Sequence, residues 1–230
     1  MHPPAAPLPK KSLEQADEVL QTSLPQGQWV RIAVSCAVVL STLSLSSISV
    51  ALPVIANDLG LTPATSIWVI SGFQLSLVST IFPFSSLGEQ LGYRRIFLTG
   101  LFLLIASSII CSIAQSFETL LTGRILQGLG ASAVMAVNPA LIRLSVPASE
   151  LGRVLGTNAM LVAIATAIGP SIAAVVLSLD SWRWLFALNL PLAFLALGLG
   201  IWAMDGLPSP QTRRFDVWGA ALNICAFLLI

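Results

Sequence analysis

Residues 120–132 read LLTGRILQGLGAS, an apolar stretch with one cation, Arg124, near its middle. An arginine in a membrane segment costs at least about 2.5 kcal/mol on insertion scales, so it normally faces protein or an aqueous cavity. At 3.6 residues per turn, the helical face of Arg124 also carries Gln127, Gly128 and Asn138. This face predicts a helix that lines a polar pathway. The alternative is an arginine that snorkels to the nearby membrane surface.

The composition is that of a membrane protein. The mean hydropathy is +0.89, 56% of the residues are hydrophobic, and only 9% are charged, against roughly 25% in soluble domains. The net charge of +1 gives no reason to expect a nucleic-acid partner. One histidine, His2, and three cysteines without ligand-like spacing provide no metal site, cofactor site or catalytic triad. We therefore expect a protein that is not an enzyme.

Six apolar stretches approach or exceed the roughly 20 residues that a membrane crossing needs. They lie at 32–54, 67–87, 96–114, 120–142, 154–179 and 184–204. A seventh stretch begins near Val217 and is still apolar at Ile230, where we expect the sequence to end inside a helix. The predicted fold is an all-α membrane protein. Its predicted parts are a polar cytoplasmic tail (1–28), a six-span bundle (29–204), a cytoplasmic loop (205–216) and the truncated start of a seventh span (217–230).

The distribution of cations predicts the orientation in the membrane. With a cytoplasmic N-terminus, nine lysines and arginines lie inside and one, Arg183, lies outside, as the positive-inside rule requires. The nine are Lys10, Lys11, Arg31, Arg94, Arg95, Arg143, Arg153, Arg213 and Arg214. The tail has no signal-peptide pattern, and we expect it to be disordered or to lie on the surface. A short amphipathic turn near 13–20 is the alternative.

Several motifs resemble those of the major facilitator superfamily. Residues 124–131 are similar to its fourth-helix signature, R-x-x-Q-G-x-G-A, and they fall in the fourth predicted span. The run WRWLFALNLP at 182–191 resembles the W-R-W-x-F-x-x-N-x-P of fourteen-helix drug:proton antiporters. Gly169 and Pro170 are similar to the G-P of the antiporter motif. They predict a helix kink, which is either purely structural or helps to set the direction of exchange.

The loop after the second span is a weakened copy of another pattern of this family, G-x-L-a-D-R-x-G-R-R/K. Leu87, Gly92, Arg94 and Arg95 match, Glu89 replaces the aspartate, and two further positions differ. Gly92 would allow a tight turn. The resemblance implies a conformational latch of Glu89, Gly92, Arg94 and Arg95 against the other half of the transporter. The alternative is that these cations only set topology.

The resemblance also implies that Arg124 takes part in proton coupling or in the electrostatics of a substrate site. The predicted substrate and proton pathway comprises Ser44, Ser49, Arg124, Gln127 and Asn138. Ser44 stands where drug:proton antiporters have an acidic residue, and Ser49 stands where they have asparagine. These serines either line a cavity or hydrogen-bond to their own helix. No aspartate or glutamate lies deep in the six predicted spans, so a proton carrier would have to lie elsewhere.

These observations predict a secondary transporter whose N-terminal bundle forms half of a midplane site. The family resemblance implies proton-coupled efflux of small organic or drug-like compounds from a bacterial inner membrane. The expected partners are membrane lipids, the substrate, protons where transport is coupled to them, and the missing C-terminal half. Two alternatives stay open. One is a proton-independent facilitator or importer, which Ser44 favours, and the other is a transporter-like sensor that binds a ligand without moving it.

Overall fold

A computed structural model of the chain describes residues 10–179 and 181–205, and within this part it contains helices and no strands. The predicted loop beyond residue 205 and the predicted seventh span lie outside the described residues. The helices are α1 (Lys10–Asp58), α2 (Pro63–Ser66), α3 (Trp68–Leu91), α4 (Tyr93–Ser112), α5 (Phe117–Ser145), α6 (Leu151–Leu179), α7 (Trp184–Ala187) and α8 (Asn189–Ala203).

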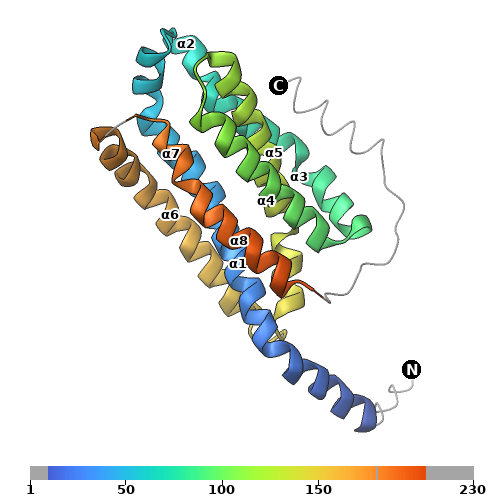
Figure 1. The fold of residues 1–230 in the computed structure, drawn as a ribbon. Coiled ribbons are helices and arrows are strands. Elements are labelled where there is room, and N and C mark those ends of the chain that lie inside the picture. The colour runs from blue at the N-terminus through green and yellow to red at the C-terminus, as the bar shows by residue number, and fades with distance from the viewer. Residues whose placement is uncertain (1–9, 180, 206–230) are drawn as a thin grey trace, which may run out of the picture.

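Six segments of the described chain are long and apolar enough to cross a membrane, which confirms the six predicted spans. They are Gly27–Asp58, Pro63–Leu91, Tyr93–Ser112, Phe117–Ser145, Leu151–Ser178 and Trp184–Ala203. The second span combines α2 with α3, and the sixth combines α7 with α8. In each of these two spans, a single residue interrupts the helix near the same end of the bundle (Figure 1).

Helix α1 begins earlier than the sequence predicted. It starts at Lys10, so residues 10–28 are helical and continue the first membrane helix, which differs from a disordered tail, whereas the alternative of a helical turn near 13–20 falls within this helix. The segment 13–21 reads LEQADEVLQ, and leucine, glutamate, glutamine and alanine are all strong helix formers. Charged residues prevent this segment from entering the hydrocarbon, but they do not prevent a helix from extending into water.

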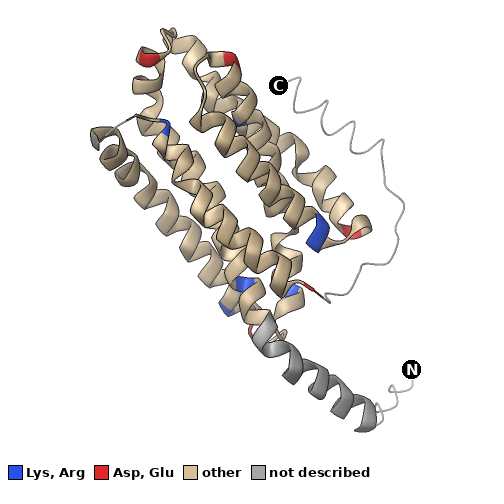
Figure 2. Cartoon of the chain, viewed as in Figure 1, with Lys and Arg blue, Asp and Glu red and all other residues tan. Residues whose placement is uncertain are grey.

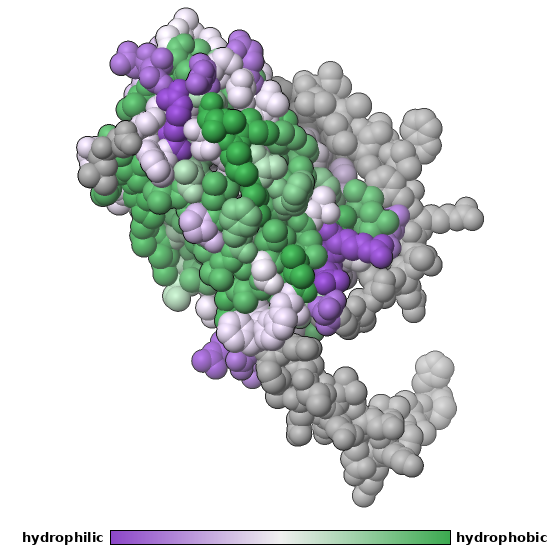
Figure 3. All heavy atoms as spheres, in the orientation of Figure 1, coloured by the Kyte–Doolittle hydropathy of each residue, from purple (hydrophilic) through white to green (hydrophobic). Residues whose placement is uncertain are grey.

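The bundle has two sets of closely packed helices. Helix α5 packs most extensively on α3 and α4, while α1 packs on α6 and α8 and also contacts α5. Figure 1 shows the two sets side by side, with α1 lying behind α6 and α8. Apart from Arg124, the described charged residues gather at the two ends of the bundle (Figure 2). The visible surface between these ends is mainly apolar (Figure 3), as expected for a surface that faces lipid.

Glycines allow the closest approach between helices. Gly100 of α4 and Gly130 of α5 face each other, and a Cβ built on either one would lie 2.8–2.9 Å from the other's carbonyl oxygen. Small residues at such crossings let two backbones approach and increase van der Waals contact, which stabilises helix association in a membrane. The α4–α5 contact therefore depends on the absence of a side chain at these two positions.

Gly92 is the single residue between α3 and α4. Its φ is +100°, in the region that favours glycine, and its backbone N–H donates to the carbonyl of Gly88. The sequence predicted a tight turn at this position, and the structure confirms it. This turn brings the second and third spans together with almost no loop.

Candidate functional site

The guanidinium group of Arg124 lies inside the helix bundle. Its side chain is fully buried, and its Nε donates to the carbonyl oxygen of Val69 in α3 at 3.0 Å. One terminal nitrogen, Nη1, donates to the carbonyl oxygen of Ser44 in α1 at 3.3 Å and to Oε1 of Gln127 at 2.6 Å. The side chain of Arg124 thus joins α5 to α1 and to α3.

Two further contacts extend this arrangement. Gln127 is itself fully buried, and its Nε2 donates to the hydroxyl of Ser108 in α4 at 3.2 Å. The guanidinium carbon of Arg124 lies 4.4 Å from the centre of the Phe73 ring in α3, a cation–π distance. We name Ser44, Val69, Phe73, Ser108, Arg124 and Gln127 the arginine network. It connects four helices.

The arginine network explains how a charge can be held where water is excluded. Burying a cation without compensation is very costly, so buried charges are paired or hydrogen-bonded. Here the acceptors are two backbone carbonyls and one amide, which carry dipoles and no net charge. Nη2 of Arg124 has no hydrogen-bond partner within the described residues. The guanidinium faces protein and does not snorkel to the membrane surface.

Ser44 links the arginine network to the sixth span. Its hydroxyl donates to the carbonyl of Leu40 at 2.9 Å and accepts from Nδ2 of Asn189, also at 2.9 Å. Asn189 is the first residue of α8 and belongs to the WRWLFALNLP motif. Of the two alternatives that the sequence left open for Ser44, the structure shows the hydrogen bond to its own helix, and the cavity-lining role stays a prediction. Ser44 also takes part in a polar contact between helices.

The structure does not bring the other two predicted pathway residues to the arginine network. Ser49 is exposed, and its hydroxyl donates to the carbonyl of Ser46 in its own helix. Asn138 lies fourteen residues after Arg124 in α5, which is about 21 Å along a helix axis. Its Oδ1 is shielded from solvent and has no hydrogen-bond partner in the described part of the chain. The pathway formed by these five residues stays a prediction.

Helix α6 crosses α1 at Gly169. A Cβ at Gly169 would overlap the hydroxyl of Ser46, which also donates to the carbonyl of Ala165 at 3.5 Å. Pro170 lies inside α6, next to this contact. Ala165 and Ala173 are buried on the same side of the helix. Gly169 of the antiporter-like motif therefore lies at a point of close approach between α1 and α6.

Only part of the predicted latch has partners in the described chain. Arg94 donates from Nη2 to the carbonyl of Ile201 at 3.0 Å and forms an ion pair with Asp205 at 2.9 Å, both beside the end of α8. Glu89 and Arg95 are exposed, and no ion pair is found for either among the described residues. Arg94 therefore ties the start of α4 to the end of the sixth span. The latch against another half of the protein stays a prediction.

The opposite end of the bundle has a polar cluster that the sequence did not predict. Arg183 donates to Asp58 at 3.0 Å and to the carbonyl of Ala114 at 2.9 Å, and the indole of Trp182 donates to Asp58 at 2.9 Å. The guanidinium of Arg183 also lies over the Trp182 ring at 4.3 Å. These contacts tie the ends of α1 and α4 to the α6–α7 link. Trp182 is buried, and its indole therefore packs within the protein as well as lying near the end of the bundle.

Asn189, Ser108 and Phe73 are partners of the predicted site that the sequence did not reveal. Asn189 could have been found, because it occupies a fixed place in a recognised motif. Ser108 and Phe73 are an ordinary serine and an ordinary phenylalanine in apolar helices, and only the packing shows that they contact the arginine network. The described residues contain no group of three or more His, Cys, Asp or Glu that could bind a metal.

The arginine network predicts a stability difference between two neighbouring positions of α5. Arg124→Ala leaves Gln127 and two carbonyls without their donor, so we expect the free energy of unfolding to fall by about 1–3 kcal/mol. Ile125→Ala is the matched control, because the Ile125 side chain is 40% exposed. Thermal unfolding of the full-length gene product in detergent measures both. Equal losses of stability in the two variants would show that the network does not hold the helices together.

Comparison with known proteins gives the same family as the motifs. The family model described as Major Facilitator Superfamily matches residues 34–224. The uncharacterized transporter YebQ of Escherichia coli is 42% identical over 211 residues, which is 90% of this chain and 46% of YebQ. The riboflavin transporter RibZ of Clostridioides difficile is 32% identical over 208 residues, or 88% of this chain and 45% of RibZ. Several further relatives are named as multidrug or antibiotic resistance proteins.

A solved structure has the same arrangement of helices. The crystal structure of a peptide transporter, POT, in complex with sulfate matches with a TM-score of 0.69 at 16% identity. The match covers 89% of this chain and 44% of that one. The chain spans about half the length of the curated relatives that it matches.

Proposed function

The chain belongs to the major facilitator superfamily, and on that premise we propose that it forms the N-terminal half of a proton-coupled exporter of small organic compounds. The buried arginine network is the observation that carries this proposal. Hydrogen bonds that link four helices hold these helices in fixed relative positions. Such a bundle is suited to move as one rigid body. In transporters of this architecture, alternating access is largely rocking of one bundle against the other around a central site.

The charge of Arg124 has a second consequence in this proposal. It is fully buried, and a charge withdrawn from water acts over a longer distance because the surrounding dielectric is low. The charge of Arg124 therefore stabilises a negative group in a pathway beside α1. This group could be a deprotonated carboxyl or part of a bound substrate. Proton release from such a carboxyl and substrate binding would then be linked. Gln127 supports this role by accepting from the guanidinium.

The proposed substrates are small organic compounds, including drug-like ones. The names of the relatives cover riboflavin and antibiotics, and the WRWLFALNLP run resembles fourteen-helix drug:proton antiporters. We further propose a bacterial inner membrane, with the N-terminus in the cytoplasm. The cation bias supports this orientation, because Arg31, Arg94, Arg143 and Arg153 all lie at one end of the membrane-spanning helices.

Flux measurements in proteoliposomes test this proposal. With the full-length gene product, we expect an imposed proton gradient to drive transport of at least one compound from a panel of lipophilic dyes and riboflavin. A protonophore should remove this flux. Arg124→Ala should reduce it to the level of protein-free liposomes, whereas Ile125→Ala should retain it. Gradient-independent flux would contradict proton coupling and leave transport in place. A lack of flux together with tight ligand binding would favour a sensor.

A second candidate function is a facilitator that moves solute without protons. Ser44 favours it, because serine occupies the position at which related antiporters have an acid. Within the described residues no acid lies deep in a span, and Asp58, Glu89, Glu118 and Asp205 are all at helix ends or beyond them. Proton exchange would then need an acidic group outside the described part of the chain.

Substitution of Ser44 tests whether this residue lies in the transport pathway. If Ser44 occupies the position of a proton-binding acid, Ser44→Asp should make flux newly dependent on pH, because a carboxyl can bind and release a proton. Ser44→Asn is the matched control, since an amide of similar size does not titrate. We expect the pH profile of flux to change only for the aspartate variant. Identical profiles for the two variants and the wild type would remove Ser44 from the pathway.

A further inference from the structure

A pocket with both charged and apolar lining residues opens between α1 and α6, at the end of the bundle where the first and fifth membrane spans begin. Its volume is about 550 Å³, within the range of small-molecule sites. Neither the arginine network nor the predicted latch includes it. Its lining comes from the stretch of α1 between Gln28 and Cys36, from Glu150, and from the stretch of α6 between Arg153 and Leu161. We call this cavity the α1–α6 pocket.

The charges around the pocket favour an anion. Arg31 and Arg153 supply two positive charges, and Glu150 supplies one negative charge. Glu150 lies 4.0 Å from Arg31, at the limit of an ion pair, and its side chain is 56% exposed. Such an exposed contact contributes little to stability, so the single charge of Glu150 does not neutralise both Arg31 and Arg153. The first turn of α6, which begins at Leu151, adds the positive end of a helix dipole.

The pocket also has an unused hydrogen-bond acceptor. Oδ1 of Asn158 is shielded from solvent and has no hydrogen-bond partner within the described residues. A shielded polar atom without a partner is costly, and such atoms usually bond to water or to a ligand. The hydroxyl of Thr157, also in the lining, donates to the carbonyl of Arg153 and can still accept. A ligand that carries both a phosphate and hydroxyl groups would meet these requirements.

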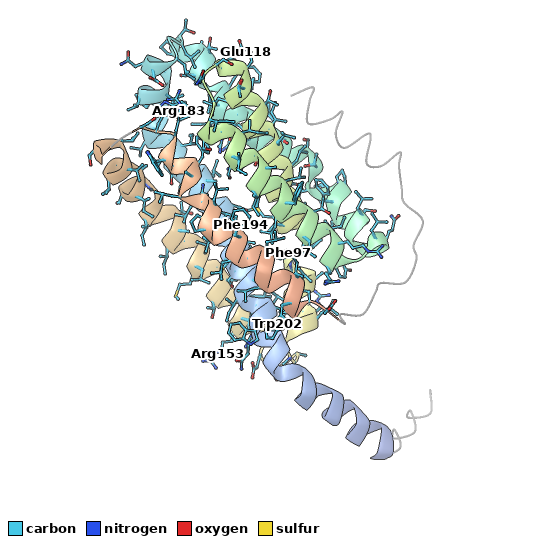
Figure 4. The ribbon with its side chains drawn as sticks, in the orientation of Figure 1. Phe97, Glu118, Arg153, Arg183, Phe194 and Trp202 are labelled. Carbon is cyan, nitrogen blue, oxygen red and sulfur yellow. The ribbon has the colours of Figure 1, made fainter. Side chains whose placement is uncertain are left out.

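The depth of the pocket in the membrane indicates where such a ligand comes from. Gln28–Cys36 lie at the start of the first span, and Leu151–Leu161 lie at the start of the fifth. Trp29 and Trp202 pack edge to face at this end with centroids 5.8 Å apart, and both are exposed, as expected for an interfacial aromatic belt. Figure 4 shows Arg153 and Trp202 close to this end of the bundle. The polar part of the pocket therefore lies at the level of lipid headgroups.

The apolar part of the lining completes this chemistry. Ile32, Cys36, Val154 and Leu161 line the same cavity as the two arginines. A free phosphate ion would leave this apolar surface uncovered, whereas a glycerophospholipid brings its glycerol and the first methylene groups of its acyl chains beside its phosphate. Basic pockets between membrane helices are a recognised way of binding anionic headgroups.

We propose that the α1–α6 pocket binds the headgroup of an anionic glycerophospholipid, with Arg31 and Arg153 on its phosphate and Asn158 accepting from a headgroup hydroxyl. This lipid would fill the gap between the start of the first membrane span in α1 and the start of the fifth in α6. Both helices take part in the Ser46–Gly169 contact deeper in the bundle, so the lipid would hold the two helices together at their ends. The lipid site is independent of the transported substrate and of proton coupling.

Lipid-binding measurements on the full-length gene product test this inference. We expect phosphatidylglycerol to bind more tightly than phosphatidylcholine in a native mass-spectrometry titration. Arg153→Gln should weaken phosphatidylglycerol binding about fivefold, the effect expected from one basic residue near a membrane surface. Arg153→Lys should restore part of the binding. Arg143→Gln is the matched control, because Arg143 is exposed at the same end of the bundle and lies outside the pocket; it should bind as the wild type does.

Three results would overturn the inference. The first is equal binding of the two lipids. The second is an equal effect of Arg153→Gln and Arg143→Gln, which would mean that only the general charge of this surface matters or that another part of the protein covers the pocket. The third is displacement of phosphatidylglycerol by inorganic phosphate at comparable concentration, which would assign the pocket to a soluble anion. A failure of the wild-type protein to transport any compound would count against the proposed function alone, because lipid binding is measured without transport.

Discussion

The bundle is organised around one physical constraint, the burial of a guanidinium group in a protein that crosses a membrane. Arg124 cannot stay in the interior without acceptors, and the acceptors come from backbone carbonyls of α1 and α3 and from the amide of Gln127. The positions of α1 and α3 relative to α5 must therefore agree to within hydrogen-bond distance. A shift of α1 or α3 by one residue would remove a carbonyl from the guanidinium and leave a donor without a partner.

Close packing at glycines meets this constraint. Gly128 of α5 lies against the backbone of Phe73, and Gly130 lies against Gly100 of α4. Side chains at these positions would push α3 and α4 away from α5 and would lengthen the bonds of the arginine network. The ends of the bundle are fixed separately, by Arg183 at one end and by Arg94 at the other. A polar centre with tied ends is consistent with the proposal that this bundle moves as a unit.

The sequence predicted the six spans well, because about 20 apolar residues in a row have few other structures available. It also placed Arg124 and Gln127 on one helical face, where their side chains are hydrogen-bonded, because such polar residues are rare in hydrocarbon. It did not predict Ser108, nor the ion pair between Arg94 and Asp205, since these depend on which helix faces lie opposite each other. Helix α1 starts earlier than the predicted first span for a different reason. Hydropathy marks where the membrane ends, whereas helix propensity continues the helix to Lys10.

If Arg124 and Gln127 act together to hold the helices, a double-mutant cycle will measure their interaction. Arg124→Met and Gln127→Met keep most of the side-chain length and remove the polar groups, so the unfolding free energies of the two single variants and the double variant isolate the interaction. We predict a coupling energy of about 1 kcal/mol or more, within the range for contacting polar residues. Strictly additive losses of stability would contradict it, because they would mean that the two side chains act independently.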